Sequence, residues 1–91
     1  MKLKTIVLSL GGSVIVPEEV DVPFVSMFKR VVLGLEHMRF VIICGGGRIC
    51  RKYQNAAREM GVASKRDLDW IGIRATRLNA ELIRAGFGSE A

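Results

Sequence analysis

Two short segments of the chain are almost entirely apolar, and each is followed directly by glycines. They are residues 5–10 (TIVLSL) and residues 40–44 (FVIIC), and both are rich in β-branched side chains. Runs this short and this apolar are typical of strands in a parallel sheet that is covered on both faces. The pattern therefore predicts two buried β-strands.

Between these strands, apolar residues recur at helical spacing, three and four positions apart. They are Phe24, Phe28, Val31, Val32 and Leu35. Asp21 is placed to cap this amphipathic helix, and Pro23 falls in its first turn. Two strands joined through a helix run parallel, and such crossovers are almost always right-handed.

Two further helices are predicted after the second strand. The apolar face of the first consists of Ile49, Tyr53, Ala56, Ala57 and Met60, and that of the second of Leu68, Ile71, Ala75, Leu78, Leu82 and Ala85. Gly61 is placed to end the first of them. Ser64 and Asp67 form a capping pattern for the second, which should reach Gly86 with a solvated face opposite its apolar one. The order β-α-β-α-α indicates an α/β fold.

Both glycine segments, residues 11–13 (GGS) and 45–47 (GGG), lie where a predicted strand ends. Because the carboxyl ends of parallel strands meet at one edge of a sheet, the two loops are expected to line one crevice, where open α/β sheets bind ligands. Glycine lets the main chain approach a ligand and point N–H groups at it, and a following helix N-terminus adds a positive dipole. The pattern predicts a site for more than one phosphate.

A cation stands one helical turn beyond the second glycine loop. Arg51 lies four residues past Gly47. A guanidinium at this place can bind phosphate in a forked geometry and stays charged at physiological pH. Arg48 and Lys52 are less well placed, and we expect both to be exposed helix charges.

Length and charge narrow the class of protein. With 91 residues, 49% of them hydrophobic, the chain is globular and forms one small domain or part of a larger one. Its net charge of +5 favours anionic partners. Only charge would support nucleic-acid binding, so we expect no nucleic-acid partner. No apolar stretch approaches the roughly 18 residues of a membrane span, and we expect a cytoplasmic protein without membrane contact.

The remaining candidate residues and motifs argue against several kinds of site. Cys44 and Cys50 form neither a CxxC pair nor a disulfide framework, and His37, the only histidine, has no evident partner. No protein metal site is therefore expected, and the cysteines should be small buried residues. There is no Walker-type loop, the second glycine loop lacks the third small residue of a dinucleotide fingerprint, and the first lacks the second glycine of a hydrolase elbow.

Three segments together resemble the archaeal uridylate (UMP) kinases of the amino acid kinase superfamily. They are IVLSLGGSVIVPEEVD (residues 6–21), VIICGGGRICRKY (41–53) and DLDWIGIRATRLNAELI (67–83). The resemblance implies the parallel-sheet sandwich of that superfamily, and transfer of a phosphoryl group from ATP to UMP with Mg²⁺ shielding the phosphates. It also implies a homo-oligomer, which in the family is a hexamer.

By position in the family's motifs, the resemblance implies a role for each candidate residue. The implied ATP-binding residues are Gly11, Gly12, Ser13, Gly47 and Arg51. The implied UMP-binding residues are Gly45, Gly46 and Asp69. Arg51 would act as the catalytic cation that bridges toward the transferred phosphate, and the Asp69 carboxylate would accept hydrogen bonds from uridine hydroxyls. Thr76, Arg77 and Asn79 match the family's third helix and are expected to be structural or at a subunit contact.

Two departures from the family pattern stand out. Ser9 occupies the position where many bacterial relatives have a lysine, although archaeal members tolerate other residues there. Family members also run considerably further, and their C-terminal half carries the pocket for the donor base. We therefore expect residues 1–91 to be the N-terminal part of a single kinase domain, truncated and inactive alone. Two alternatives stay open: a kinase for another small acceptor of the superfamily, and a non-catalytic remnant that binds nucleotide or phosphate.

Overall fold

The computed structural model describes residues 3–91 and has the predicted α/β order. Its elements are β1 (Lys4–Leu10), α1 (Gly12–Ile15), α2 (Val22–Gly34), β2 (Met38–Cys44), α3 (Gly47–Glu59), α4 (Lys65–Phe87) and the short 3-10 helix η1 (Gly88–Glu90). The predicted strands and the three longer helices are confirmed. The four-residue helix α1, which begins inside the first glycine loop, was not predicted.

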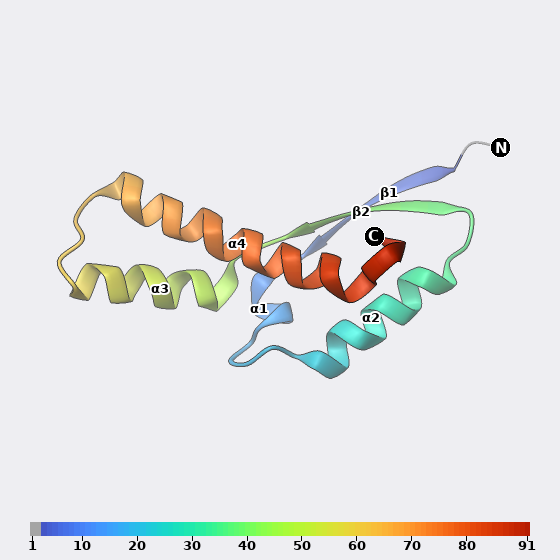
Figure 1. The fold of residues 1–91 in the computed structure, drawn as a ribbon, viewed down its shortest axis with the longest axis horizontal. Coiled ribbons are helices and arrows are strands. Elements are labelled where there is room, and N and C mark those ends of the chain that lie inside the picture. Colours follow the sequence, from blue (N-terminus) through green and yellow to red (C-terminus); the bar gives the residue numbers. More distant parts are fainter. Residues whose placement is uncertain (1–2) are drawn as a thin grey trace.

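The two strands form a parallel pair whose carboxyl ends meet at the glycine loops. β1 and β2 are in register from Lys4 opposite Met38 to Leu10 opposite Cys44. Helix α4 runs along the molecule, with α3 beside its first half and α2 beside its second half (Figure 1). The glycine loops therefore lie near the middle of the molecule, where both strands end, α1 and α3 begin and α4 passes.

Local capping signals fix where the long helices begin and end. The Asp21 side chain accepts a hydrogen bond of 3.0 Å from the Phe24 N–H at the start of α2. Ser64 does the same for the Asp67 N–H, at 3.2 Å, at the start of α4. Gly61 has a φ of 96° just after α3, a left-handed conformation that favours glycine. All three predicted boundaries are confirmed.

Within residues 3–91, the core lies on one face of the sheet. The buried cluster consists of Leu10, Ile15, Val16, Val32, Cys44, Ile83 and Phe87, contributed by both strands and by α1, α2 and α4. On the opposite face, Val7, Val41 and Ile43 are exposed at 61%, 45% and 55%. The two-sided cover that the apolar strands predict is therefore not supplied by residues 3–91.

Helix α4 buries a different stripe from the one that its apolar pattern predicts. The buried residues are Ala75, Asn79, Ile83 and Phe87, each four positions from the next. Leu78 and Leu82, predicted to be core residues, are exposed at 64% and 37%. The prediction is wrong here because the apolar face of α4 is wider than the surface that the rest of the chain offers to cover it.

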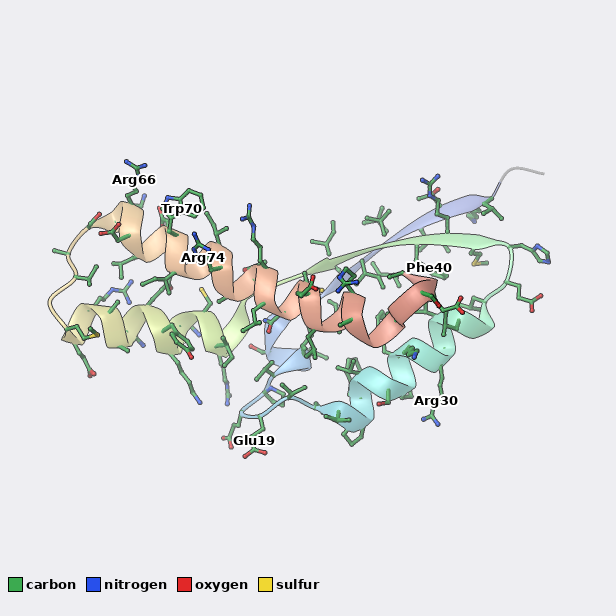
Figure 2. All side chains as sticks on the ribbon, viewed as in Figure 1. Glu19, Arg30, Phe40, Arg66, Trp70 and Arg74 are labelled. Carbon is green, nitrogen blue, oxygen red and sulfur yellow. The ribbon has the colours of Figure 1, made fainter. Side chains whose placement is uncertain are left out.

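The exposed face of α4 carries the predicted charged side chains, but Trp70 and Leu78 are exposed on it as well. Arg74, Arg77, Glu81 and Arg84 are all exposed. Figure 2 shows Arg66 and Trp70 projecting from α4 on the side away from α3. Neither α4 nor any other helix within residues 3–91 is long and apolar enough to cross a membrane.

Candidate functional site

The two glycine loops interlock through their backbones. A Cβ built on Gly12 would lie 2.6 Å from the carbonyl oxygen of Gly45 and 2.5 Å from the carbonyl carbon of Gly46. Gly47 has a φ of 58°, and a Cβ there would collide with the backbone of Ser13. Only glycine allows main chains to approach this closely. The prediction that both loops line one place in the fold is confirmed.

Several N–H groups of the interlocked loops have no acceptor in the part of the chain that the structure describes. The Gly45 N–H donates to the carbonyl oxygen of Leu10, at 3.0 Å. No acceptor within residues 3–91 is hydrogen-bonded to the N–H groups of Gly12, Ser13, Gly46 or Gly47. The last two open α3, whose 13 residues direct the positive end of a helix dipole at the loops. The arrangement suits an anion that accepts several hydrogen bonds.

Asn79 binds the second glycine loop from α4. Its side chain is 3% exposed, and its amide donates to the carbonyl oxygens of Gly45, at 2.9 Å, and Gly46, at 3.4 Å. Sequence reasoning assigned Asn79 only a structural or subunit-contact role and missed this bond. The predicted apolar face of α4 did not include position 79, so no local pattern in the sequence indicated this bond.

The three cations that follow the second loop have different surroundings. Arg48 donates to the carbonyl oxygen of Pro17, at 3.3 Å, and its Nη1 lies 4.0 Å from the Glu18 carboxylate. Arg51 and Lys52 are exposed and make no hydrogen bond or ion pair within residues 3–91. Arg48 therefore ties down the segment after α1, whereas the Arg51 guanidinium is available one turn beyond the loop.

A hollow of about 600 Å³ lies between α3 and α4 and includes Asp69. It is lined by Cys50, Gln54, Asp69, Gly72, Ile73, Thr76 and Arg77, all from α3 and α4. The hydroxyl of Thr76, one of these lining residues, lies so close to Gly46 that a Cβ on Gly46 would approach it to 2.9 Å. The Gln54 amide donates to the carbonyl oxygen of Leu68, at 2.9 Å, and so attaches α3 to α4 beside Asp69. Thr76 therefore lies beside Gly46 and also lines the hollow that contains Asp69, although the glycine loop itself does not line it.

The cysteines differ in burial and chemistry. Cys44 is buried at the end of β2, and burial raises the pKa of its thiol. Cys50 is half-buried in the hollow beside Asp69, so the prediction of two buried thiols holds for Cys44 only. Both are free thiols.

Metal-ligating side chains are not clustered in the part of the chain that the structure describes. Within residues 3–91, no group of three or more His, Cys, Asp or Glu side chains could hold a metal ion. Mg²⁺ prefers carboxylate oxygens and phosphates, and no carboxylate is hydrogen-bonded to either glycine loop in this part of the chain.

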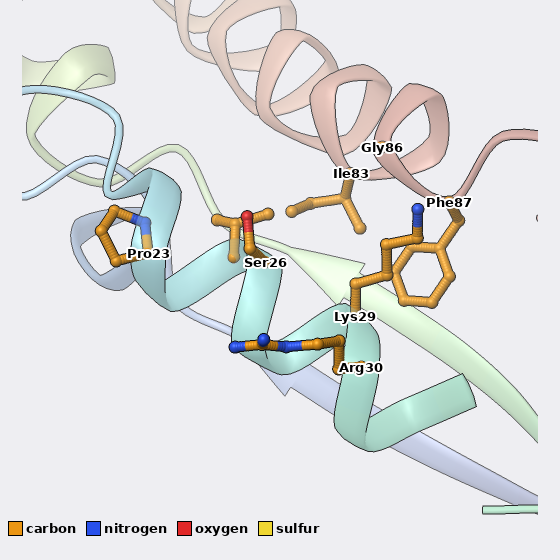
Figure 3. Close-up of a pocket in the computed structure, with 8 residues that line it drawn as sticks. Pro23, Ser26, Lys29, Arg30, Ile83, Gly86 and Phe87 are labelled. Carbon is orange, nitrogen blue, oxygen red and sulfur yellow. The ribbon is translucent and has the colours of Figure 1, made fainter. Parts of the chain in front are cut away.

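A separate hollow of about 490 Å³ lies between α2 and the end of α4. Figure 3 shows the Lys29 side chain reaching from α2 toward Phe87, with Ser26 and Ile83 further along the same gap. None of the predicted site residues lines this hollow. Its lining gives no support for a role in the chemistry of the glycine loops.

Comparison with known proteins agrees with the resemblance seen in the motifs. Residues 4–91 match the profile of the amino acid kinase family. The chain is 39% identical over 88 residues to a uridylate kinase of Thermococcus kodakarensis, covering 94% of this chain and 38% of that protein. It is 42% identical over 77 residues to a uridylate kinase of Thermoplasma acidophilum, covering 85% of this chain and 33% of that protein. It is 41% identical over 93 residues to a uridylate kinase of Methanoculleus marisnigri, covering 98% of this chain and 38% of that protein. The chain thus spans well under half the length of these relatives.

Proposed function

Because the chain belongs to the amino acid kinase family, we propose that it supplies the phosphate-binding part of an enzyme that transfers a phosphoryl group from ATP to UMP. The products would be UDP and ADP. The observation that carries the proposal is the interlock of the two glycine loops, which brings unpaired N–H groups from both strand ends together. Donor and acceptor phosphates must lie side by side for transfer, and such donors can hold them there.

Each loop has its own share in the proposed transfer. The N–H groups of Gly12, Ser13 and Gly47, with Gly11 shaping the turn, would hold the ATP phosphates. Gly45 and Gly46 would face UMP. Asp69, in the hollow that is also lined by Thr76 next to Gly46, would accept hydrogen bonds from the uridine hydroxyls.

Arg51 would add a charge that backbone amides cannot supply. It is exposed and has no partner in the described part of the chain, so its guanidinium can reach the transferred phosphate without first breaking an ion pair. Stabilising charge that develops in the transition state is commonly the largest catalytic contribution. Mg²⁺ would accompany ATP through its phosphates, since residues 3–91 offer no ligand cluster for it.

Residues 1–91 would be the N-terminal part of one kinase domain, whose donor-nucleotide half lies outside this sequence. Two observations support this view: the chain covers 38% or less of the relatives it matches, and large apolar side chains on the sheet and on α3 and α4 are uncovered. A parallel sheet requires cover on both faces. A cytoplasmic homo-oligomer is part of the same proposal, and sedimentation of the complete enzyme measures its size.

A chimera tests the proposed reaction. Residues 1–91 replace the matching segment of the Methanoculleus marisnigri uridylate kinase, which is 41% identical to this chain over 93 residues. We expect UDP formation from UMP and ATP, no activity of the 91-residue chain alone, and a loss of about 10²-fold or more in kcat for Arg51→Ala. Lys52→Ala, one exposed cation further along α3, is the matched control and should change little.

The same assay separates the alternatives. An acceptor screen with other small phosphate and carboxylate acceptors shows whether UMP is preferred, and the absence of a preference contradicts the choice of UMP. A folded chimera that binds nucleotide without turnover supports the non-catalytic remnant. Turnover by the 91-residue chain alone that Arg51→Ala abolishes contradicts the view that the chain is inactive by itself.

A further inference from the structure

Asn79 is the only polar side chain that is buried within residues 3–91, at 3% exposed. It belongs to the buried stripe of α4, where its neighbours one turn away are Ala75 and Ile83. A buried amide in such a series costs free energy unless it is hydrogen-bonded. Its partners are two carbonyl oxygens of the second glycine loop, so Asn79 stabilises the loop and does not contribute to apolar packing.

The two accepting carbonyls belong to the peptide units that matter for anion binding. In a trans peptide the C=O and the N–H of one unit lie in one plane and point in opposite directions. The carbonyl of Gly45 shares its unit with the Gly46 N–H, and the carbonyl of Gly46 shares its unit with the Gly47 N–H. Asn79 donates to both carbonyls, at 2.9 and 3.4 Å. It therefore turns both N–H groups away from α4.

These are the N–H groups of the second loop that have no acceptor within residues 3–91. We propose that Asn79 is a positioning residue: its amide helps to fix the Gly45–Gly46 and Gly46–Gly47 peptide planes so that the Gly46 and Gly47 N–H groups face the phosphates bound at this loop. The identity of the anion as a nucleotide phosphate rests on the proposed function. The Gly46 carbonyl also accepts from the Cys50 N–H, at 3.3 Å, in the first turn of α3, so the Gly45–Gly46 unit depends most on Asn79. Glycine backbones rotate more freely than any other, so without Asn79 the Gly46 N–H would lose its fixed direction.

Asn79→Asp tests the assignment with almost no change of shape. An ionised carboxylate accepts hydrogen bonds but donates none, so it would repel both carbonyls. The probe is inorganic pyrophosphate added to the 91-residue chain, followed through the backbone amide signals in ¹H–¹⁵N NMR. We expect Gly46 and Gly47 to respond in the wild type, and affinity to fall about tenfold or more in N79D, which corresponds to roughly 1.4 kcal/mol.

Asn55→Asp is the matched control, because Asn55 is exposed on α3 and its only side-chain hydrogen bond within residues 3–91 is to Arg58. It should leave pyrophosphate affinity within about twofold of the wild type, since substitutions of exposed residues usually have small effects on stability. Lowering the pH protonates the new carboxyl of N79D and restores one donor. Relative to wild type at the same pH, the affinity of N79D should therefore recover in acid, whereas a general loss of packing would not recover.

A measurement on the wild type covers the case in which N79D does not fold. The side-chain amide protons of Asn79 should exchange with solvent much more slowly than those of Asn55. Equal exchange rates would overturn the inference, as would a folded N79D that binds pyrophosphate like the wild type or a wild type whose Gly46 and Gly47 amides do not respond. Loss of UDP formation in the chimera with the pyrophosphate response intact contradicts the proposed function and leaves the role of Asn79 supported.

Discussion

Replacing Gly12 by alanine perturbs the interlock of the glycine loops at its closest point. The new methyl group would lie 2.5 Å from the Gly46 carbonyl carbon and closer still to the Gly47 nitrogen, where ordinary contact begins at 3.4 Å. The loops must therefore separate by about 0.9 Å or more, and the opposing atoms are backbone, which cannot rotate aside as a side chain can. Overpacking of this kind costs about 1–3 kcal/mol.

Gly86→Ala is the control, because it makes the same chemical change in a helix without a clash. No heavy atom lies within 4 Å of a Cβ built on Gly86 in α4. Alanine is favoured over glycine in a helix by about 0.5–1 kcal/mol. For a domain of this size about 1 kcal/mol shifts Tm by roughly 4–8 °C. Gly86→Ala should therefore raise Tm by a few degrees, whereas Gly12→Ala should lower it by a similar or larger amount.

Thermal unfolding followed by circular dichroism measures both variants, and a pyrophosphate titration reports on the site. Gly12→Ala should also weaken pyrophosphate binding, since the N–H groups of the two loops no longer converge. If Gly12→Ala unfolds at or above the wild-type temperature and binds pyrophosphate normally, the two loops do not interlock as described.

Two further predictions concern stability. Asp21→Ala should lower the free energy of unfolding by about 0.5–2 kcal/mol, because α2 loses the acceptor for the Phe24 N–H; urea unfolding measures it, and an unchanged value contradicts the cap. Burial raises the pKa of the Cys44 thiol, so the unfolded chain ionises this thiol more readily than the folded one. The free energy of unfolding should therefore fall as pH rises above the ordinary thiol pKa. Cys50 should also react with iodoacetamide before Cys44, and equal labelling rates of the two thiols in the folded chain would contradict the burial of Cys44.

Features with local signals were predictable from the sequence. The Asp21 and Ser64 caps depend on residues within one turn, and both are present. The two strands followed from short β-branched runs, and their parallel pairing followed from the helix between them. Because pairing brings both strand ends to one edge, the meeting of the two glycine loops could be predicted without any knowledge of their contacts.

Features that depend on distant partners were not predictable. The hydrogen bonds of Asn79 reach residues 33 and 34 positions away, and no local pattern indicates them. Leu78 fits the apolar face of α4 but is exposed, because burial depends on what covers a helix and not on its periodicity alone. The segment that forms α1 is too short for its apolar residues to show a helical repeat.

If the interlocked loops hold phosphates of two different nucleotides on their two sides, as proposed above, UMP and ATP should affect different amides. Residue-resolved NMR titration of the chain with each nucleotide measures this. UMP should perturb the amides of Gly46, Asp69 and Gly72, ATP should perturb those of Gly12 and Ser13, and Gly47 should respond mainly to ATP. Competition of both nucleotides for one set of amides, or responses confined to residues away from both loops, would contradict the proposal.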